Sequence, residues 1–423
     1  MSDPSRQPPR TALNGVLDVE TLVLEAVAAY AAQAARALRL ESLPVHPARV
    51  EANLRSLEAL TVNGRAANAW APLSGFFPAA AGGWVRTHTN SPWHRARLLR
   101  ALGLPQHADA SDLGRELLSR DAHDIEALAD AAGALAVRVR EPAESPTLLG
   151  AAAAPLWLGE PTVPRTSREP LRVLDLSTVI AGPTAGRALA AIGADVLRVD
   201  HPARPELPDL FTDTSAGKRS LALDANERGP ELRALAASAD IVLLGSRPGA
   251  LDRFGLGSAE LRDRHPDLIT VSVRAYPADS PWANRRGFDS LVQAVSGISR
   301  VEGSAPGRPG ALRAQALDHS TGYLLAAAAL AARSGVPLPA LSGLPVASVP
   351  TRGFELSLAG VARALLSRPK PSAPSPEVAP IPPAETESVT GPQGQIRRVR
   401  AMLDIPGRVQ GPVPESGSDP GGW

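Results

Sequence analysis

The sequence contains no cysteine and few aromatic residues. The absence of cysteine in 423 residues excludes disulfides, thiolate catalysis and cysteine zinc sites. The eight histidines show no spacing typical of metal ligands, so we expect no metal ion. Six tryptophans, six phenylalanines and three tyrosines are the whole aromatic content. Apolar residues nevertheless make up 44% of the chain, enough for a sizeable core.

Long apolar runs and a charge excess are also missing. No run of about eighteen apolar residues occurs, and the first twelve residues are polar, so we expect a cytoplasmic protein without a membrane partner. Lys+Arg 44 against Asp+Glu 43 gives a net charge of +1, which argues against a nucleic-acid partner. The length suits two or three domains of about 150 residues each.

The most informative stretch is 171–200, which reads as a strand, a turn, a helix and a second strand. The expected strands are 173–176 and 196–199, with a turn at 181–183 and a helix over 184–192. This βαβ order is typical of a nucleotide-binding sheet. A dinucleotide site is disfavoured, because the turn lacks the G-x-G-x-x-G glycines and places a proline where a backbone donor is needed.

Strands and helices continue to alternate after this unit. Further strands are expected at 241–244, 268–273 and 355–358, and helices at 227–237, 258–264, 287–301, 318–332 and 359–366. Alternation of this kind predicts an α/β fold with a doubly wound, mostly parallel, Rossmann-like sheet over 171–366.

The flanking segments have different compositions. We expect a disordered N-terminus at 1–12, a smaller α+β segment over 13–160, a linker at 161–170 and a proline-rich tail over 367–423 with a mobile end. Within the smaller segment lies an aromatic group: Trp70, Phe76, Phe77, Trp84 and Trp93. A small aromatic core is favoured over a platform for an acyl group or adenine, because large aromatics dominate core burial.

Motifs in the α/β region resemble a known family. They are VLDLSTVIAGPTAGRALAAIGADVLRVD from 173, GKRSLALD at 217–224, ADIVLLGSRPGALDRFGLG at 239–257, RRGFDSLVQAVSG at 285–297 and ALDHSTGYLLAAAAL at 316–330. In this order they resemble the class III CoA-transferases, the family of formyl-CoA and carnitine CoA-transferases. The resemblance implies coenzyme A as a substrate, a carboxylic acid acceptor and a homodimer. In that family the smaller domain follows the nucleotide-binding half, whereas here the segment resembling it comes first, so the chain resembles a member with rearranged halves.

The resemblance also assigns roles to individual residues. Asp318 matches the family's nucleophilic aspartate, although from the residues alone it is an ordinary candidate for a helix N-cap. Asp289 matches an acidic position that orients the nucleophile, with a second helix cap as the alternative. The implied CoA-binding residues are Val179, Ala181 and Gly182 at the opening of the site, Arg253 at the phosphates, and Lys218 and Arg286 at the ADP part.

The expected reaction moves CoA from an acyl-CoA to a carboxylic acid through an aspartyl intermediate. Two alternatives stay open. One is an acyl-CoA racemase or isomerase, which requires a histidine where this chain has Phe288, unless the neighbouring His319 replaces it. The other is a non-catalytic CoA-binding protein, since the glycine-rich lid of some transferases is not recognisable here.

Overall fold

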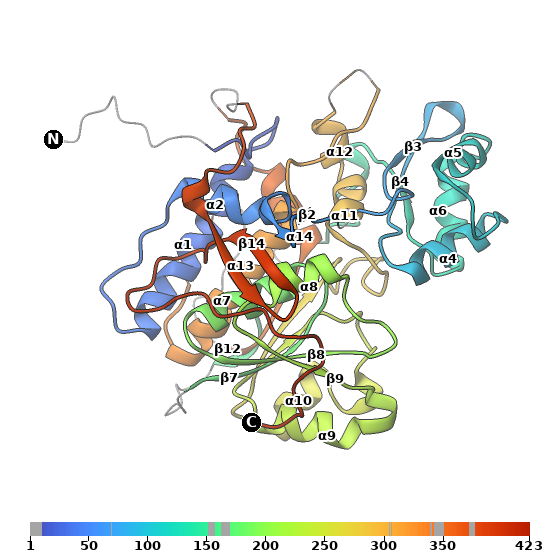
Figure 1. The fold of residues 1–423 in the computed structure, drawn as a ribbon. Coiled ribbons are helices and arrows are strands. Elements are labelled where there is room, and N and C mark those ends of the chain that lie inside the picture. The colour runs from blue at the N-terminus through green and yellow to red at the C-terminus, as the bar shows by residue number, and fades with distance from the viewer. Residues whose placement is uncertain are drawn as a thin grey trace.

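The computed structural model shows a large α/β body with a smaller lobe on one side (Figure 1). It describes residues 11–68, 70–150, 157–161, 170–303, 305, 307–338, 341, 351–371 and 377–423. Most of the expected linker at 161–170, and residues 1–10 of the expected disordered N-terminus, lie outside this part of the chain. Residues Thr11 and Ala12 are described and buried, so the expected disorder extends two residues too far.

The body is built on a seven-stranded sheet. Its strands, in spatial order, are β6 (Trp157–Pro161), β12 (Thr351–Ser357), β11 (Ile269–Arg274), β10 (Ile241–Leu244), β7 (Arg172–Leu176), β8 (Asp195–Asp200) and β9 (Arg219–Ala222). All neighbours pair in parallel except β6, which runs antiparallel to β12 at the edge. Along the chain, β7 to β9 extend the sheet in one direction and β10 to β12 in the other. This confirms the doubly wound α/β fold.

Apolar residues on both faces bury the sheet between helices. Alternate side chains of a strand point to opposite faces, so Val173 and Leu174 enter two different cores. One face packs on α7 (Ala181–Ala191), α13 (Ala316–Ser334), α11 (Asp289–Ser296) and α14 (Leu358–Leu366). The other packs on α9 (Ala225–Ser238) and α10 (Ser258–Arg264), at the bottom of Figure 1.

Two local expectations need correction. Residues 181–183 are the first turn of α7 rather than a turn before it. Pro183 is tolerated there because the first N–H groups of a helix have no partner within the helix. The helix expected over 287–301 is divided into α11 and α12 (Ile298–Val301) at Gly297, whose φ of +88° is outside the helical range.

The N-terminal helices α1 (Val19–Ala37), α2 (Pro47–Leu54) and α3 (Ser56–Ala59) pack on the body. The hydroxyl of Tyr30 in α1 donates to the Ala188 carbonyl of α7 at 2.7 Å, and its ring lies 5.8 Å from that of Tyr323 in α13. Residues 13–160 were expected to form one smaller segment. The apolar stripe of α1 instead packs on α13, so α1 belongs to the body.

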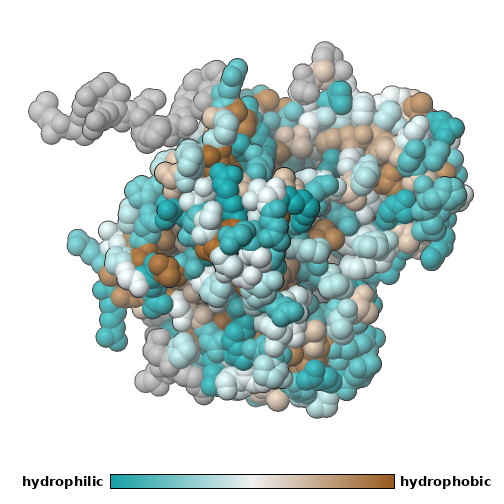
Figure 2. Space-filling view, in the orientation of Figure 1, coloured by the Kyte–Doolittle hydropathy of each residue, from teal (hydrophilic) through white to brown (hydrophobic). Residues whose placement is uncertain are grey.

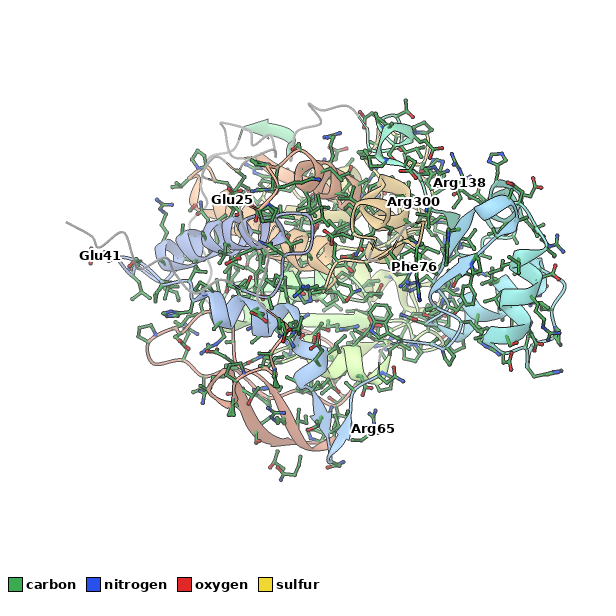
Figure 3. The ribbon with its side chains drawn as sticks, turned by 90° about the horizontal axis from the view of Figure 1, so that it is seen from above. Glu25, Glu41, Arg65, Phe76, Arg138 and Arg300 are labelled. Atoms are coloured by element: carbon green, nitrogen blue, oxygen red, sulfur yellow. The ribbon has the colours of Figure 1, made fainter. Side chains whose placement is uncertain are left out.

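The lobe consists of residues 71–138. It contains the antiparallel strands β3 (Phe76–Pro78), β4 (Trp84–Thr87) and β5 (Ala136–Arg138), the 3-10 turn η1 (Ala80–Gly82), and the helices α4 (Pro92–Ala101), α5 (Ala110–Leu118) and α6 (Ala122–Ala131). The lobe has an apolar core of its own, which includes Val85, Leu98 and Leu113. Figure 3 shows Phe76 and Arg138 where the lobe meets the body.

The C-terminal segment returns across the body. The hairpin β13 (Thr386–Gly391) and β14 (Gly394–Val399) forms a four-stranded sheet with β1 (Thr61–Val62) and β2 (Arg65–Ala66). The expected mobile end is wrong: Asp419 pairs with Arg219 at 2.8 Å, and the Trp423 indole donates to the Leu235 carbonyl at 3.1 Å. The remaining elements are α8 (Pro208–Thr214) and the 3-10 turns η2 (Pro142–Glu144), η3 (Asp252–Phe254) and η4 (Pro383–Glu385).

The surface seen in Figure 2 is mainly hydrophilic, with apolar residues scattered between polar ones. Within the described ranges, no helix combines the length and apolar character that a membrane crossing requires. The same residues contain no group of three or more histidine, aspartate or glutamate side chains placed to bind a metal ion.

Candidate active site

A cleft of about 750 Å³ lies at the carboxyl ends of the parallel strands. Its floor contains Leu176 from the end of β7 and Gly245 from the end of β10, the two strands at which the order of the sheet reverses. Ligands of doubly wound sheets bind at this position. The lobe supplies the opposite wall through Trp93 and Arg97 of α4. A cleft of this volume suits a cofactor-sized molecule.

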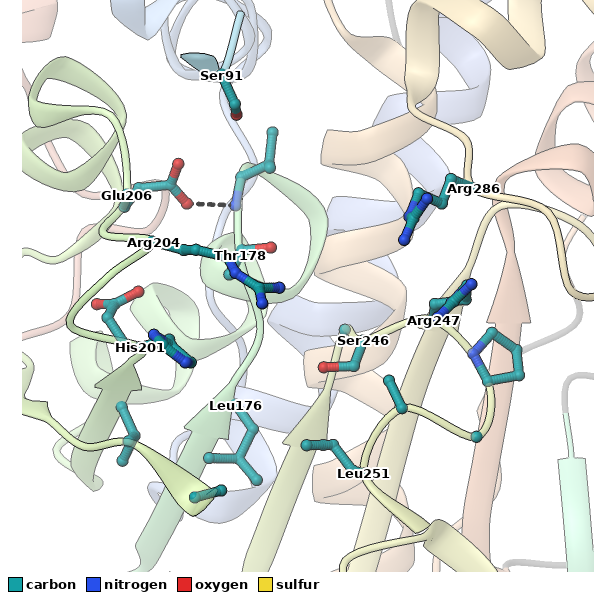
Figure 4. Close-up of a pocket in the computed structure, with 18 of the residues that line it drawn as sticks. Ser91, Leu176, Thr178, His201, Arg204, Glu206, Ser246, Arg247, Leu251 and Arg286 are labelled. Carbon is teal, nitrogen blue, oxygen red and sulfur yellow. Dashed lines mark hydrogen bonds between the residues drawn. The ribbon is translucent and has the colours of Figure 1, made fainter. Parts of the chain in front are cut away.

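Four arginines make the cleft strongly basic: Arg97, Arg204, Arg247 and Arg286. Figure 4 shows Arg204 on one side of the cleft and Arg247 and Arg286 on the other. Among the described residues, no carboxylate pairs with any of the four, and Arg286 donates only to the Gly133 carbonyl at 3.2 Å. Burial first, and then the other three arginines, lower the pKa of Arg286. Unpaired positive charges gathered in one cavity favour a polyanionic ligand.

The acidic side chains in the cleft are occupied by other contacts. Arg198 pairs with Asp200 at 2.7 Å and with Glu206 at 3.2 Å. Glu206 also accepts the Val179 backbone N–H at 2.5 Å, the contact drawn as a dashed line in Figure 4. Asp224 caps α9 by accepting the N–H of Asn226 at 2.8 Å. The cleft therefore keeps its positive character.

Val179 lies at the bend between β7 and α7 with a φ of +70°. A β-branched side chain rarely adopts this conformation, and such strain costs about 1–3 kcal/mol. The hydrogen bond from its N–H to Glu206 helps to hold the bend. Val179 and Phe288 line both the cleft and a second, smaller cavity, so the two spaces adjoin at these residues.

The second cavity, of about 20 Å³, contains both predicted catalytic aspartates. We call it the inner cavity. Its walls come from the body, from α3, from Trp70 just before the lobe and from the lobe itself: Leu57, Trp70, His88, Asn90, Val179, Ile180, Leu210, Phe288, Asp289, Ser290, Gln315 and Asp318. The structure thus brings Asp289 and Asp318 together at one end of the cleft.

Asp318 is not an N-cap, because α13 begins at Ala316 and its cap residue is Gln315. The capping contact comes from Asp289, whose Oδ2 accepts the Asp318 N–H at 3.0 Å, while its Oδ1 accepts the Gln293 amide at 2.5 Å. Both expectations for Asp289, an orienting acid and a helix cap, are therefore compatible with this geometry. The side chain of Asp318 receives no hydrogen bond from any described residue.

The two carboxyls are buried and close enough to affect each other's ionisation. Burial raises the pKa of Asp289 to about 6, and the hydrogen bonds from Gln293 and the α13 backbone oppose this rise. The pKa of Asp318 is raised well above its usual range, by burial first and then by the charge of Asp289. Perturbed acids in a cavity are typical of functional sites.

The predicted CoA-binding residues divide into two groups. Val179, Arg253 and Arg286 line the cleft, and Arg253 lies over the Phe254 ring at 4.5 Å. Ala181 and Gly182 are buried in the packing of α7 and are absent from the cleft walls. A Cβ atom at position 182 would lie 2.2 Å from the side chain of Ser177, so close packing on β7 explains this glycine.

The position of Lys218 contradicts its predicted contact with the ADP part of CoA. Its side chain is fully buried and its Nζ pairs with Asp175 at 2.8 Å and with the Pro183 carbonyl at 2.9 Å. Burial lowers the pKa of Lys218 to about 8. An ammonium group enclosed in this way cannot reach a ligand phosphate, so Lys218 stabilises the β7–α7 connection instead.

The sequence predicted one small core of the aromatic residues before and within the lobe. The structure shows that these residues do not form such a core. Trp70 lies on the wall of the inner cavity and Trp93 on the wall of the cleft. The rings of His88 and Phe288 stack at 4.1 Å and 7°, and the His94 ring meets both of them edge-on. The platform interpretation therefore fits Trp70 and Trp93 better than the core interpretation does.

Three arginines of the cleft were not predicted from the sequence: Arg97, Arg204 and Arg247. Arg204 and Arg247 follow the ends of β8 and β10, where a doubly wound sheet places its ligand contacts, so this rule would have identified them. No local signal marks Arg97, because its role depends on where α4 docks.

Comparisons with known proteins show that part of this chain is similar to a known family. Residues 169–335 match CoA-transferase family III. The match confirms the resemblance drawn from the motifs, and the family III segment contains both aspartates of the inner cavity. A probable fatty acyl-CoA transferase of Mycobacterium tuberculosis is 35% identical over 176 residues, 38% of this chain and 45% of the relative. A formyl-CoA:oxalate CoA-transferase of Streptomyces avermitilis is 34% identical over 177 residues, 39% of this chain and 43% of the relative.

A mouse succinyl-CoA:glutarate CoA-transferase is 30% identical over 171 residues, 36% of this chain and 39% of the relative. The chain thus spans about half the length, or less, of these curated relatives. Among solved structures, a hypothetical protein from Mycobacterium tuberculosis aligns with a TM-score of 0.41 and 30% identity, over 49% of this chain and 57% of that one.

Proposed function

We propose that this protein is a CoA-transferase that moves CoA from an acyl-CoA to a carboxylic acid, with Asp318 as the nucleophile. The observation that carries the proposal is the position of Asp318. Its carboxyl group has no hydrogen-bond partner among the described residues and faces an inner cavity, which adjoins a cleft lined by unpaired arginines. The family III segment and the transferase names of its relatives support the same reaction class.

The ligand is expected to lie along the cleft. The phosphates of CoA meet Arg97, Arg204, Arg247 and Arg286, and the pantetheine arm runs along the cleft toward Val179 and Phe288, where the acyl group enters the inner cavity. Arginine suits phosphate because its planar fork of donors matches two phosphate oxygens. The acceptor carboxylic acid reaches the Asp318 carboxyl group after the donor acid has left.

The proposed chemistry proceeds by covalent exchange at Asp318. An oxygen of its carboxylate attacks the thioester carbonyl, an O–C bond forms, the C–S bond breaks, and CoA leaves as a thiolate. The thiolate then attacks the Asp318 carbonyl of the mixed anhydride and releases the donor acid. The acceptor carboxylate attacks the resulting aspartyl thioester, forms a second mixed anhydride and releases the CoA thiolate. This thiolate attacks the acceptor carbonyl of that anhydride, which forms the new acyl-CoA and frees the Asp318 carboxylate.

Asp289 has a positioning role in this proposal. Through its bond to the Asp318 N–H it fixes the first turn of α13, and Gln293 holds the Asp289 carboxylate from the other side. Its negative charge also raises the pKa of Asp318, which makes the ionised carboxylate a stronger base and nucleophile.

Segments that precede the family III segment complete the site. Trp70 and His88 line the inner cavity, and Arg97 lines the cleft. This supports the proposal that the chain is a rearranged member whose smaller half comes first. A homodimer and a cytoplasmic location stay predictions; light scattering of the purified protein tests the first.

The test is to trap the intermediate. With an acyl-CoA donor and no acceptor, hydroxylamine should convert Asp318 to a hydroxamate detectable by peptide mass spectrometry. Asp318→Asn should lose turnover by several orders of magnitude and give no adduct, while CoA still binds. Wild-type exchange rates in the variant would contradict the role of Asp318. Tight CoA binding without exchange in the unmodified protein would favour a non-catalytic CoA-binding protein.

His88 favours a second candidate, an acyl-CoA racemase or isomerase. His319, the substitute considered from the sequence, is absent from the walls of the inner cavity, whereas His88 shares that cavity with Asp318. Burial lowers the pKa of His88 to about 3, so the imidazole is neutral but a weak base, and this candidate rests on the position of His88 rather than on its basicity. Deuterium uptake at the α-carbon of an acyl-CoA in D₂O, abolished by His88→Ala, would support this candidate over simple transfer.

A further inference from the structure

The inner cavity is much smaller than the cleft that leads to it. Its volume of about 20 Å³ compares with about 750 Å³ for the cleft. A cavity needs roughly 10–15 Å³ to admit one water molecule, so the inner cavity holds about one small group. A methyl or ethyl group next to Asp318 meets this limit, and a long acyl chain does not.

Packing fixes the body side of the inner cavity. Ile180 and Leu210 are almost fully buried and pack with Leu57 in one apolar cluster. Ile180 belongs to the β7–α7 connection, Leu210 to α8 and Leu57 to α3, so this wall joins three elements of the body. Close-packed walls resist displacement, because overpacking a core costs typically 1–3 kcal/mol.

Trp70 forms the outer wall and is 42% exposed. Its backbone is held on both sides. The Trp70 N–H donates to Asn68 at 3.1 Å, and the Asn68 N–H donates to Asp209 at 2.7 Å. The Ala71 N–H donates to Asn90 at 3.1 Å. Among the described residues that line the cavity, Trp70 thus has the one large apolar side chain that is exposed, while its main chain is held by these hydrogen bonds.

The charges around the inner cavity also limit the ligand. Asp289 and Asp318 are its acidic groups, and no lysine or arginine is among the described residues that line it. Arg86 acts on Asp289 electrostatically but is not one of the lining residues. A second carboxylate on the acyl chain would be buried beside two acids without a cation, which is strongly unfavourable.

We propose that the acyl site accepts short, uncharged acyl groups of about acetyl or propionyl size, and that Trp70 sets the limit on chain length. This inference rests on the proposed transferase function and narrows its substrate class. It separates this chain from relatives whose names specify dicarboxylates, oxalate and glutarate. Dicarboxylates are disfavoured by charge, and long chains by space.

The experiment compares kcat/KM for acetyl-CoA, hexanoyl-CoA and succinyl-CoA with isotopically labelled propionate as the acceptor. In the full chain, acetyl-CoA should exceed both others by roughly 100-fold, since even one misplaced methylene changes selectivity about 10–200-fold. Trp70→Ala should raise the hexanoyl-to-acetyl ratio at least about tenfold and leave succinyl-CoA slow. Trp70→Phe should give an intermediate ratio, and Trp423→Ala, distant from the cavity, should leave the ratio unchanged.

Each result has one meaning. Equal use of hexanoyl-CoA, or an unchanged ratio in both correctly folded Trp70 variants, would overturn the length limit and leave the transferase proposal intact. Equal use of succinyl-CoA would overturn the charge argument alone. No exchange with any of the three donors would overturn the proposed function and this inference together.

Discussion

Replacing Asp289 with asparagine should change the pH dependence of both stability and activity. The pKa of Asp289 in the folded protein is about 6, against an ordinary value of 3.8. A raised carboxyl pKa means that the folded protein holds this proton more tightly than the unfolded chain does. Ionisation of Asp289 therefore opposes folding: its cost is absent below about pH 4, grows as the pH rises to about 6, and is constant above that.

The size of the effect follows from the shift. Each pKa unit corresponds to about 1.4 kcal/mol, so the rise from 3.8 to about 6 lowers the free energy of unfolding by about 3 kcal/mol at neutral pH. Asparagine carries no such charge but loses one of two acceptor oxygens, at a pH-independent cost of about 1–3 kcal/mol. The stability of Asp289→Asn relative to the unmodified protein should thus rise by about 3 kcal/mol between pH 4 and pH 8.

Urea unfolding of both proteins at a series of pH values measures this difference. Asp124→Asn, at an exposed position in α6, provides a control with the same change of side chain. The variant should also move the acidic limb of kcat/KM to lower pH, because the charge of Asp289 raises the pKa of Asp318. Parallel stability curves and an unmoved acidic limb would show that Asp289 does not titrate against Asp318.

Two further predictions concern the cleft and the packing of α7. Arg247→Ala should weaken CoA binding about tenfold or more in calorimetric titration, while Arg115→Ala on exposed α5 should not; equal affinities would remove Arg247 from the ligand site. Gly182→Ala should lower the free energy of unfolding by about 1–3 kcal/mol, because the new Cβ would lie 2.2 Å from the side chain of Ser177. Thermal melts of both variants measure this loss. Gly229→Ala in α9, where a Cβ meets its nearest atom at 3.5 Å, should be neutral or stabilising. Equal losses of stability in the two variants would refute the steric argument.

Most of the elements and the type of sheet could be predicted from the sequence alone. Short apolar runs at 173–176 and 241–244 became parallel strands, because side chains buried on both faces leave a continuous apolar signature. The expected helix at 258–264 has the observed bounds. Ordered motifs placed Asp289 and Asp318 in the same family pattern, and both lie in one cavity. Local composition carries this information, so it can be read without coordinates.

Which charged side chains are available to a ligand depends on the tertiary structure. Lys218 and Arg253 stand in equally polar motifs, yet Lys218 is enclosed by Asp175 and Arg253 lines the cleft. Arg97 and Arg204, more than a hundred positions apart, meet because α4 docks opposite the end of β8. Burial and ion pairing depend on partners distant in sequence, since they arise when elements pack, and no local pattern records them.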